Sequence, residues 1–185
     1  MGIFDHCKAL KDVRSAGIEI YASAETFKSF NIDSGRRINP VENKTLIRLG
    51  TFDVLCFSVE HDCPGCLGFI VREKETSEFL LFAIDTSYIK QRFNYPFSII
   101  MLECSYDKEI LDRRVEDKTI NEALAKRLLT SHMSKHNCFS YLDKFCDLKN
   151  CREIHLLHMS ANNIDKKNTQ IELEKRFFIK TIVKE

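Results

Sequence analysis

The chain has 185 residues, of which 44% are hydrophobic and 30% charged, and its 28 Lys and Arg against 27 Asp and Glu give a formal net charge of +1. This length and composition are typical of one globular domain with a sizeable core, so we expect residues 1–185 to form a single domain. The balanced charge disfavours a strongly basic face that binds nucleic acid through bulk electrostatics.

Hydropathy and cysteine content bear on the cellular compartment. No apolar run approaches the roughly 18 residues of a membrane span, and no secretory signal is recognisable. Eight Cys would indicate disulfide bonds in a small secreted chain. In a longer chain without a secretory signal they favour reduced thiols, so the sequence predicts a cytoplasmic protein without membrane partners.

The first predicted elements are short. Ile18–Tyr21 predicts a strand and Ala24–Phe30 a helix, followed by a polar loop, Asn31–Asn43. Two adjacent Arg in this loop, Arg36 and Arg37, are suited to clamping a phosphate. A solvated loop explains the same pair, and both interpretations stay open.

A polar segment in the first half of the chain carries candidate chemistry. It spans residues 61–66, holds one His, one Asp and two Cys, and lies between the apolar runs Phe52–Val59 and Leu67–Val71. Both runs are rich in β-branched and aromatic residues and predict strands. The preceding segment, Thr45–Gly50, predicts the first strand of a hairpin.

Three later apolar runs each end in a side chain that can bind a metal or a proton. The runs and the residues that follow them are Phe79–Ile84 with Asp85, Phe97–Leu102 with Glu103, and Ile154–Leu157 with His158. Ligands gathered at strand ends are a common way to build a metal site on a rigid sheet. We therefore expect the strands ending at His61, Asp85, Glu103 and His158 to converge on one edge of a β-sandwich flanked by helices. The run Phe97–Leu102 is typical of a central strand covered on both faces.

The remaining segments predict helices and an edge strand. The helical stretches are Asp107–Val115, Asn121–Thr130, Ser134–Cys146 and Thr169–Phe178, and Ile179–Val183 predicts the edge strand. His132 lies between the second and third helices, where Ser131 and Ser134 are candidate caps.

Three motifs, in this order, carry a resemblance to a known family. They are His61-Asp62-Cys63-Pro64-Gly65-Cys66-Leu67-Gly68-Phe69, Asp85-Thr86-Ser87-Tyr88 and Ser131-His132-Met133-Ser134. The ordered set resembles the metallo-β-lactamase-fold metallohydrolases, in particular a phage and Gram-positive branch related to ribonuclease Z-like phosphodiesterases. The resemblance implies an α/β protein with an αββα sandwich.

The amino terminus departs from the pattern of this family. Met1–His6 falls where the family carries His-x-His-x-Asp-His, and Asp5 and His6 match its last two positions. Met1 and Ile3 stand in place of the first two His. The strands that family members carry before this motif are missing, so we expect the fold without its first strands. An unpaired sheet edge and an uncovered apolar face would then favour a homodimer.

The resemblance also implies a reduced metal centre. By position, one site would keep only His61 and Asp85, whereas the other would keep four ligands, Asp5, His6, Asp85 and His158. We therefore expect one Zn²⁺ or Mn²⁺ per chain. In the alternative, Asp5 and His6 belong to a disordered terminus beside a pocket that has lost its metal.

Roles in catalysis follow from the same resemblance. His132 would protonate the leaving oxygen, Glu103 would orient His132, and Asp5 would orient the attacking water. Ser160 is a further candidate for contact with the substrate, and so is Arg36 on the separate ground of the Arg pair in its loop. The competing explanation makes His132 an exposed neighbour of two helix caps.

Two classes of function therefore remain. The first is a metal-dependent hydrolase acting on a phosphodiester, either in nucleic acid or in a small molecule such as a cyclic nucleotide. The second is a non-catalytic nucleotide-binding or decayed protein of the same fold. The pairs Cys63/Cys66 and Cys146/Cys151 also allow a structural zinc site or a redox pair, although small buried or surface thiols explain them more simply.

Overall fold

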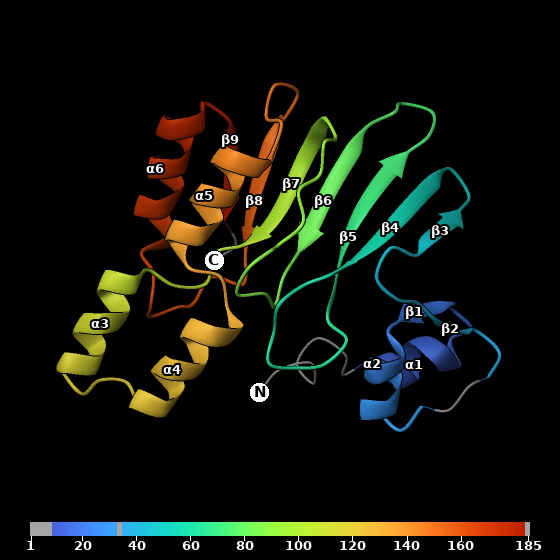
Figure 1. Cartoon of the computed structure of the whole chain (residues 1–185), viewed down its shortest axis with the longest axis horizontal. Coiled ribbons are helices and arrows are strands. Elements are labelled where there is room, and N and C mark those ends of the chain that lie inside the picture. Colours follow the sequence, from blue (N-terminus) through green and yellow to red (C-terminus); the bar gives the residue numbers. More distant parts are fainter. Residues whose placement is uncertain (1–8, 33–34, 184–185) are drawn as a thin grey trace.

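The computed structural model describes residues 9–32 and 35–183 and has a mixed α/β architecture (Figure 1). The strands are β1 (Ile20–Ala22), β2 (Ile38–Pro40), β3 (Leu46–Leu49), β4 (Phe52–Ser58), β5 (Leu67–Glu73), β6 (Phe79–Ala83), β7 (Phe97–Glu103), β8 (Glu153–Leu157) and β9 (Lys180–Val183). The helices are α1 (Leu10–Ser15), α2 (Ala24–Ser29), α3 (Lys108–Glu116), α4 (Glu122–Ser131), α5 (Lys135–Phe145) and α6 (Lys166–Phe177).

Strands β3 to β9 form a seven-stranded sheet in which the chain order is also the spatial order, and β1 and β2 form a separate parallel pair. Neighbours from β3 to β6 are antiparallel, whereas β6, β7, β8 and β9 are parallel. As a result β4, β6, β7 and β8 run in the same direction. Their carboxyl ends therefore lie at the same edge of the sheet, which positions the candidate site.

One face of the large sheet carries the main hydrophobic core. Ile70, Leu81, Ile100 and Ile154 are at most 3% exposed and belong to one buried cluster with side chains of α5 and α6. The helical side of this cluster includes Tyr141, Leu142 and Leu173. The sheet residues alternate with less buried neighbours because successive side chains of a strand point to opposite faces.

The opposite face of the sheet is apolar but only half-buried. Phe69, Phe82 and Met101 are direct partners across β5, β6 and β7, and all three are of intermediate burial. Ile99 and Met101 of β7 are likewise half-buried, so the expectation that this central strand is covered on both faces is wrong for these two positions. Helices α5 and α6 pack on the other face only (Figure 1).

The amino-terminal part has its own small core. Ile20, Phe27, Ile32 and Ile38 form a buried cluster that joins β1, α2 and β2. The prediction of a continuous loop over Asn31–Asn43 was wrong at β2, where three residues pair with β1. Such a short strand ending in Pro carries no alternating pattern, and its pairing depends on β1 rather than on its own sequence.

Helix boundaries follow capping side chains. Asp107, Asn121 and Ser134 accept hydrogen bonds from backbone N–H groups in the first turns of α3, α4 and α5, as expected for N-cap residues. The last helix begins at Lys166, three residues before its predicted start, because Asp165 caps it by accepting from the Asn168 N–H. Among the described residues, no helix is both long and apolar enough to cross a membrane.

Gly68 offers a test of how tightly β5 packs. A Cβ atom at this position would lie 2.3 Å from the ring of Phe57, which is 2% exposed and belongs to the core. We expect Gly68→Ala to lower the free energy of unfolding by about 1–3 kcal/mol, because the core would be overpacked. Urea denaturation measures this change.

Gly50→Asn is the matched control. Gly50 has a φ of +57°, a Cβ added to it would meet no atom within 4 Å, and Asn tolerates this left-handed conformation. We expect a change below about 0.5 kcal/mol for it. Equal losses in the two variants would contradict the close contact at Gly68.

Candidate metal centre

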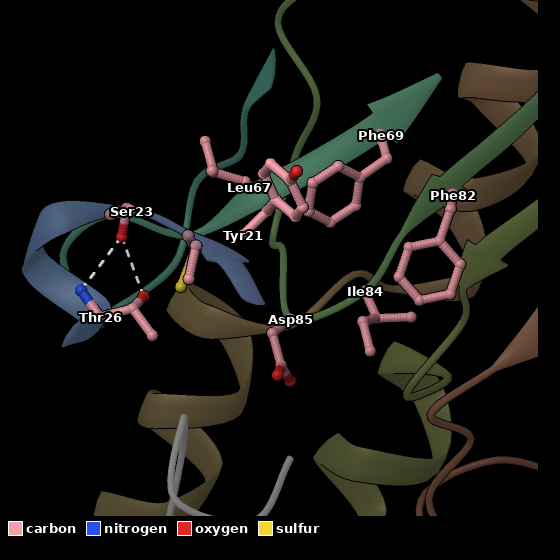
Figure 2. A pocket seen from close by; sticks show the side chains of 11 residues that line it. Tyr21, Ser23, Thr26, Leu67, Phe69, Phe82, Ile84 and Asp85 are labelled. Carbon is pink, nitrogen blue, oxygen red and sulfur yellow. Dashed lines mark hydrogen bonds between the residues drawn. The ribbon is translucent and has the colours of Figure 1, made fainter. Parts of the chain in front are cut away.

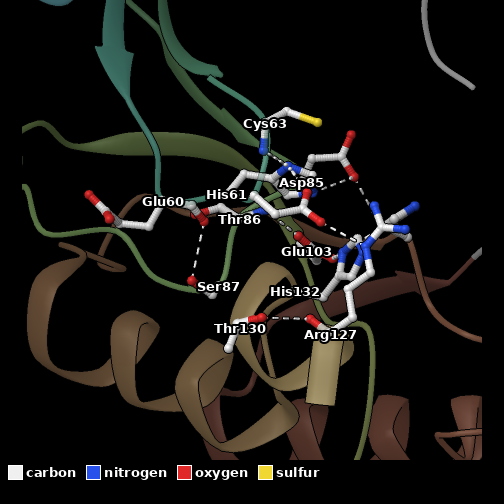
Figure 3. A network of polar contacts seen from close by, with 12 residues as sticks. Glu60, His61, Cys63, Asp85, Thr86, Ser87, Glu103, Arg127, Thr130 and His132 are labelled. Carbon is white, nitrogen blue, oxygen red and sulfur yellow. Dashed lines mark hydrogen bonds and ion pairs between the residues drawn. The ribbon is translucent and has the colours of Figure 1, made fainter. Parts of the chain in front are cut away.

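His61 follows β4 and is held by the loop that joins β4 to β5. Backbone hydrogen bonds fix this loop, from the Val59 N–H to the Cys66 carbonyl and from the Ser87 N–H to the Glu60 carbonyl. The His61 side chain has no exposed surface, and its ring faces Asp85, with 4.0 Å between His61 Nε2 and Asp85 Oδ1. Figure 3 shows both side chains turned toward the same centre.

Two groups contact the other ring nitrogen of His61. Asp62 Oδ1 lies 2.9 Å from Nδ1, and the Cys63 N–H donates to Nδ1 with 3.1 Å between the two nitrogens. Metal binding through Nε2 requires the tautomer with the proton on Nδ1, and in that tautomer Asp62 Oδ1 accepts the Nδ1 proton in place of the contact from the Cys63 N–H. Burial lowers the pKa of His61, against the opposing effect of Asp62 and Asp85, and this favours the neutral ring.

Asp62 is in turn held by Arg127 of α4. Arg127 Nε donates to Asp62 Oδ2 at 2.7 Å. Partial burial acts to raise the pKa of Asp62, but the hydrogen bond from Arg127 and the nearby His61 outweigh it, so its pKa lies below its usual value. Asp62 is therefore an ionised partner for the His61 ring.

Asp85 lies two residues after β6, and His158 directly follows β8. Each follows the end of its strand, β6 or β8, and each has a left-handed backbone, with φ of 49° and 54°. Asp and His are among the residues that tolerate this conformation, which turns the chain sharply at the strand end. His158 Nδ1 lies 3.5 Å from Asp85 Oδ1.

Glu103 ends β7 and has no exposed surface. Its Oε1 lies 2.7 Å from His132 Nδ1 and 3.0 Å from His158 Nδ1, and its Oε2 accepts the Thr86 N–H at 2.7 Å. Burial acts to raise the pKa of Glu103, but the hydrogen bonds from the two His side chains outweigh it and lower the pKa overall. An ionised Glu103 orients both imidazoles by accepting their Nδ1 protons.

His132 is placed by the turn between α4 and α5. It is the C-cap residue of α4, and the Ser105 N–H donates to the adjacent Met133 carbonyl at 2.8 Å. The His132 ring centroid lies 5.4 Å from that of His61 and 4.9 Å from that of His158. Ser134 caps α5 as expected, yet His132 faces the centre with its side chain only 13% exposed, so it is not an exposed cap neighbour.

The donor set fits a divalent metal. His61, Asp85 and His132 each offer a ligand atom within 4.8 Å of the others, and Glu103, His132 and His158 form a second such group. Within the described part of the chain, the buried His61 Nε2 has no hydrogen-bond partner. A buried polar atom without a partner is unfavourable, and a metal ligand bond would satisfy it. Imidazole and carboxylate donors suit Zn²⁺ or Mn²⁺.

The structure therefore brings together most of the candidate residues. His61, Asp85, Glu103, His132 and His158 meet at one sheet edge, whereas Asp5 and His6 lie outside the described residues. Ser160 lies two residues after His158, and its Oγ accepts the Asn162 and Asn163 N–H groups in the following turn. Arg36 is exposed before β2. The roles given to all of these residues remain predictions.

Two contributors to the centre were not assigned a role from the sequence. Asp62 was visible as the residue directly after His61, and an acidic residue beside a metal-ligand His is a recognisable signal. Arg127 gave no such signal, because 65 residues separate it from Asp62 and its place depends on how α4 packs.

The cysteines do not form the alternative zinc site. Cys63 groups with His61 and Asp62, but no cluster of metal-ligating atoms among the described residues joins Cys63 and Cys66 to Cys146 and Cys151. All seven cysteines that the structure describes are free thiols. Burial raises the pKa of Cys146 to about 12 and that of Cys151 to about 11, as for inert core thiols.

Solved structures resemble this chain although no known protein family and no curated protein sequence matches it. The metallo-β-lactamase-fold protein YhfI from Bacillus subtilis aligns with a TM-score of 0.64 at 12% identity, over 98% of this chain and 69% of that protein. A diphosphatase from the PhnP family aligns with a TM-score of 0.56 at 15% identity, over 95% and 62%. CmlA, a diiron β-hydroxylase from Streptomyces venezuelae, aligns with a TM-score of 0.56 at 9% identity, over 88% and 38%.

These similarities establish the fold. The chain has the metallo-β-lactamase fold, as the motifs predicted, and it spans about two thirds or less of the length of these three proteins. Identities of 15% or less leave the reaction open, since one fold hosts several chemistries.

Asp62 can be tested by metal affinity. Because Asp62 orients the His61 ring, we expect Asp62→Asn to weaken binding of Zn²⁺ or Mn²⁺ by about 10–100-fold. Competition with a chromophoric chelator measures the affinity without any assay of activity.

Asp143→Asn serves as the control for this experiment. Asp143 is a half-exposed residue of α5 paired with Arg176, and it takes no part in the centre. The metal affinity of this variant is expected to match that of the unaltered protein. An unchanged affinity in Asp62→Asn would show that His61 needs no support from its neighbour.

Proposed function

We propose that this protein is a metal-dependent hydrolase that cleaves phosphodiester bonds. The observation that carries the proposal is the convergence of three His and two carboxylates on one sheet edge, with His61 Nε2 buried and without a partner among the described residues. The ribonuclease Z-like motifs and the similarity to a diphosphatase support a phosphoester rather than a β-lactam. The phosphodiester is one of nucleic acid or of a small nucleotide.

Asp85, His61 and His158 are the residues that would hold the metal, together with Asp5 and His6 from outside the described part of the chain. We propose one Zn²⁺ or Mn²⁺ per chain. When bound, such an ion supplies Lewis acidity toward the phosphoryl oxygens and toward the attacking water. Ser160 and Arg36 are retained as proposed substrate contacts, and Asp5 as the residue that orients the water.

His132 is the proposed general acid. Its Nδ1 is bound to Glu103, which leaves Nε2 as the ring nitrogen for proton transfer, and the residue lies in one group with His61 and Asp85. A ring fixed in this way can donate its Nε2 proton to the leaving oxygen, while Glu103 holds the ring through Nδ1. Because Glu103 also binds His158, one carboxylate orients a proposed acid and a proposed ligand together.

The alternative is a non-catalytic protein that keeps the pocket and binds nucleotides. Turnover of phosphodiesters by the metal-loaded protein decides between the two functions, since the binding protein would show none. The cytoplasm is the proposed compartment for either function, in line with the free thiols of the described cysteines.

The general acid can be tested with leaving groups of different basicity. We expect His132→Gln to reduce kcat by about 10²–10⁴-fold for phosphodiesters with an alkoxide leaving group. The loss should be small for p-nitrophenyl esters, because p-nitrophenolate leaves without a proton. His136→Gln, on α5 and outside the centre, is the control.

Metal content must be measured in the same variant. Elemental analysis should show that His132→Gln retains the metal, whereas Asp85→Ala loses both the metal and turnover. If His132→Gln also loses the metal, His132 is a ligand and the assignment of the general acid is wrong.

We also propose a homodimer. The edge strand β3 and the adjoining end of β4 expose large apolar side chains, with Leu46 51%, Leu49 41% and Phe52 45% exposed. An exposed apolar sheet edge favours association with another chain. Light scattering is expected to give twice the chain mass of 21.6 kDa, and Leu49→Glu should shift the protein to one chain. A mass of one chain at high concentration would contradict the dimer.

A further inference from the structure

A cavity of about 200 Å³ adjoins the candidate metal centre (Figure 2). It lies between the β1–α2 segment and the half-buried face of β5 and β6. The residues that line it are Tyr21, Ala22, Ser23, Thr26, Gly65, Cys66, Leu67, Phe69, Phe82, Ile84 and Asp85.

The walls of this cavity are mainly aromatic and aliphatic. Phe69 and Phe82 are cross-strand partners with ring centroids 6.4 Å apart, and Figure 2 shows Tyr21 and Leu67 next to Phe69. Flat, apolar walls of this kind favour a planar aromatic group over a sugar or a charged group. An engineered cavity of about 150 Å³ lined by similar side chains binds benzene, so this volume suits one ring or two fused rings.

The Ser23 and Thr26 hydroxyl groups in the wall are already engaged with each other. Ser23 Oγ and Thr26 Oγ1 lie 2.9 Å apart, and Ser23 Oγ also accepts the Thr26 N–H at the start of α2. These groups therefore make no strong demand for a polar ligand. Gly65 also lines the cavity and packs closely against Ser23, since a Cβ added to Gly65 would lie 2.3 Å from Ser23 Oγ.

Asp85 belongs to both the cavity and the metal centre. It lines the cavity and also lies 4.0 Å from His61 Nε2 and 3.5 Å from His158 Nδ1. A ligand that fills the cavity therefore reaches the centre at one end. Because the cavity and the metal centre share Asp85, a group bound in the cavity is best explained as part of the substrate whose phosphoryl group reacts at the centre.

We propose that this cavity binds the aromatic ring system, an aryl group or a nucleobase, of the phosphodiester on the side that does not leave. The proposal rests on the proposed function of the neighbouring centre and adds to it a substrate class. Binding in this cavity would make the enzyme selective for diesters that carry one or two planar rings near the phosphorus.

The selectivity is tested with diesters that share one leaving group. Methyl p-nitrophenyl phosphate, phenyl p-nitrophenyl phosphate and thymidine 5′-(p-nitrophenyl phosphate) all release p-nitrophenolate and differ only in the group that stays. We expect kcat/KM for the phenyl or thymidine ester to exceed that for the methyl ester by about tenfold or more, from burial of the ring. A higher kcat/KM for the phenyl ester would indicate an aryl group, and a higher kcat/KM for the thymidine ester would indicate a nucleobase.

Filling the cavity should abolish this preference. Leu67→Trp and Ala22→Phe add bulk from opposite walls, and the ratio of aromatic to methyl ester is expected to fall to about one in each. Val71→Trp is the matched control, since Val71 lies on the same face of β5 outside this cavity and should leave the ratio unchanged. Thermal unfolding of each variant shows whether it is folded, and the two filling variants provide independent tests.

Binding of indole to the metal-free protein separates this proposal from the proposed function. Calorimetric titration is expected to detect indole binding in the unaltered protein and in Val71→Trp, and none in Leu67→Trp. If indole binds but no diester is cleaved, the cavity assignment stands and the hydrolase proposal fails. If diesters are cleaved without preference and indole does not bind, the hydrolase proposal stands and the cavity assignment is overturned.

Discussion

The carboxylate of Glu103 is the interaction on which the candidate site depends. It is fully buried at the end of β7 and accepts hydrogen bonds from Thr86, His132 and His158, which belong to three different segments of the chain. A buried charge without such partners would be strongly unfavourable, so the three segments must close around it for the site to form. Its pKa is lowered because these contacts outweigh the effect of burial. One side chain thereby fixes the direction of two imidazole rings.

The order of strands in the sheet explains why Glu103 can contact residues from three segments. Because β6, β7 and β8 are parallel neighbours, the residues at their carboxyl ends meet side by side. Strand β5 is antiparallel to both β4 and β6, so β4 runs in the same direction as β6. His61, which follows β4, therefore lies at the same edge as Asp85. Left-handed turns at Asp85 and His158 end two of these strands abruptly. A rigid frame of this kind holds donors within the sub-ångström tolerance that metal binding requires.

The same frame relates the centre to the apolar cavity beside it. Side chains alternate along β5 and β6, so the face opposite the main core presents Phe69 and Phe82 next to the strand end that carries Asp85. The candidate metal centre and the apolar cavity therefore lie next to each other at one edge of the sheet. In many enzymes specificity arises from such a combination of a few oriented polar groups and an apolar pocket.

The sequence by itself determined the local features. Apolar runs rich in β-branched and aromatic residues identified β4 to β8, and the polar residues at their ends placed His61, Asp85, Glu103 and His158 at or just after strand ends. These signals depend on neighbouring residues only. Only the tertiary structure decided which of these residues touch. Glu103 lies 29 residues from His132 and 55 from His158, and the pairing follows from the order of strands and the packing of α4 rather than from any local pattern. The support of Asp62 by Arg127 and the cavity between β1 and β5 were decided in the same way, because contacts between distant segments are fixed by how the elements pack.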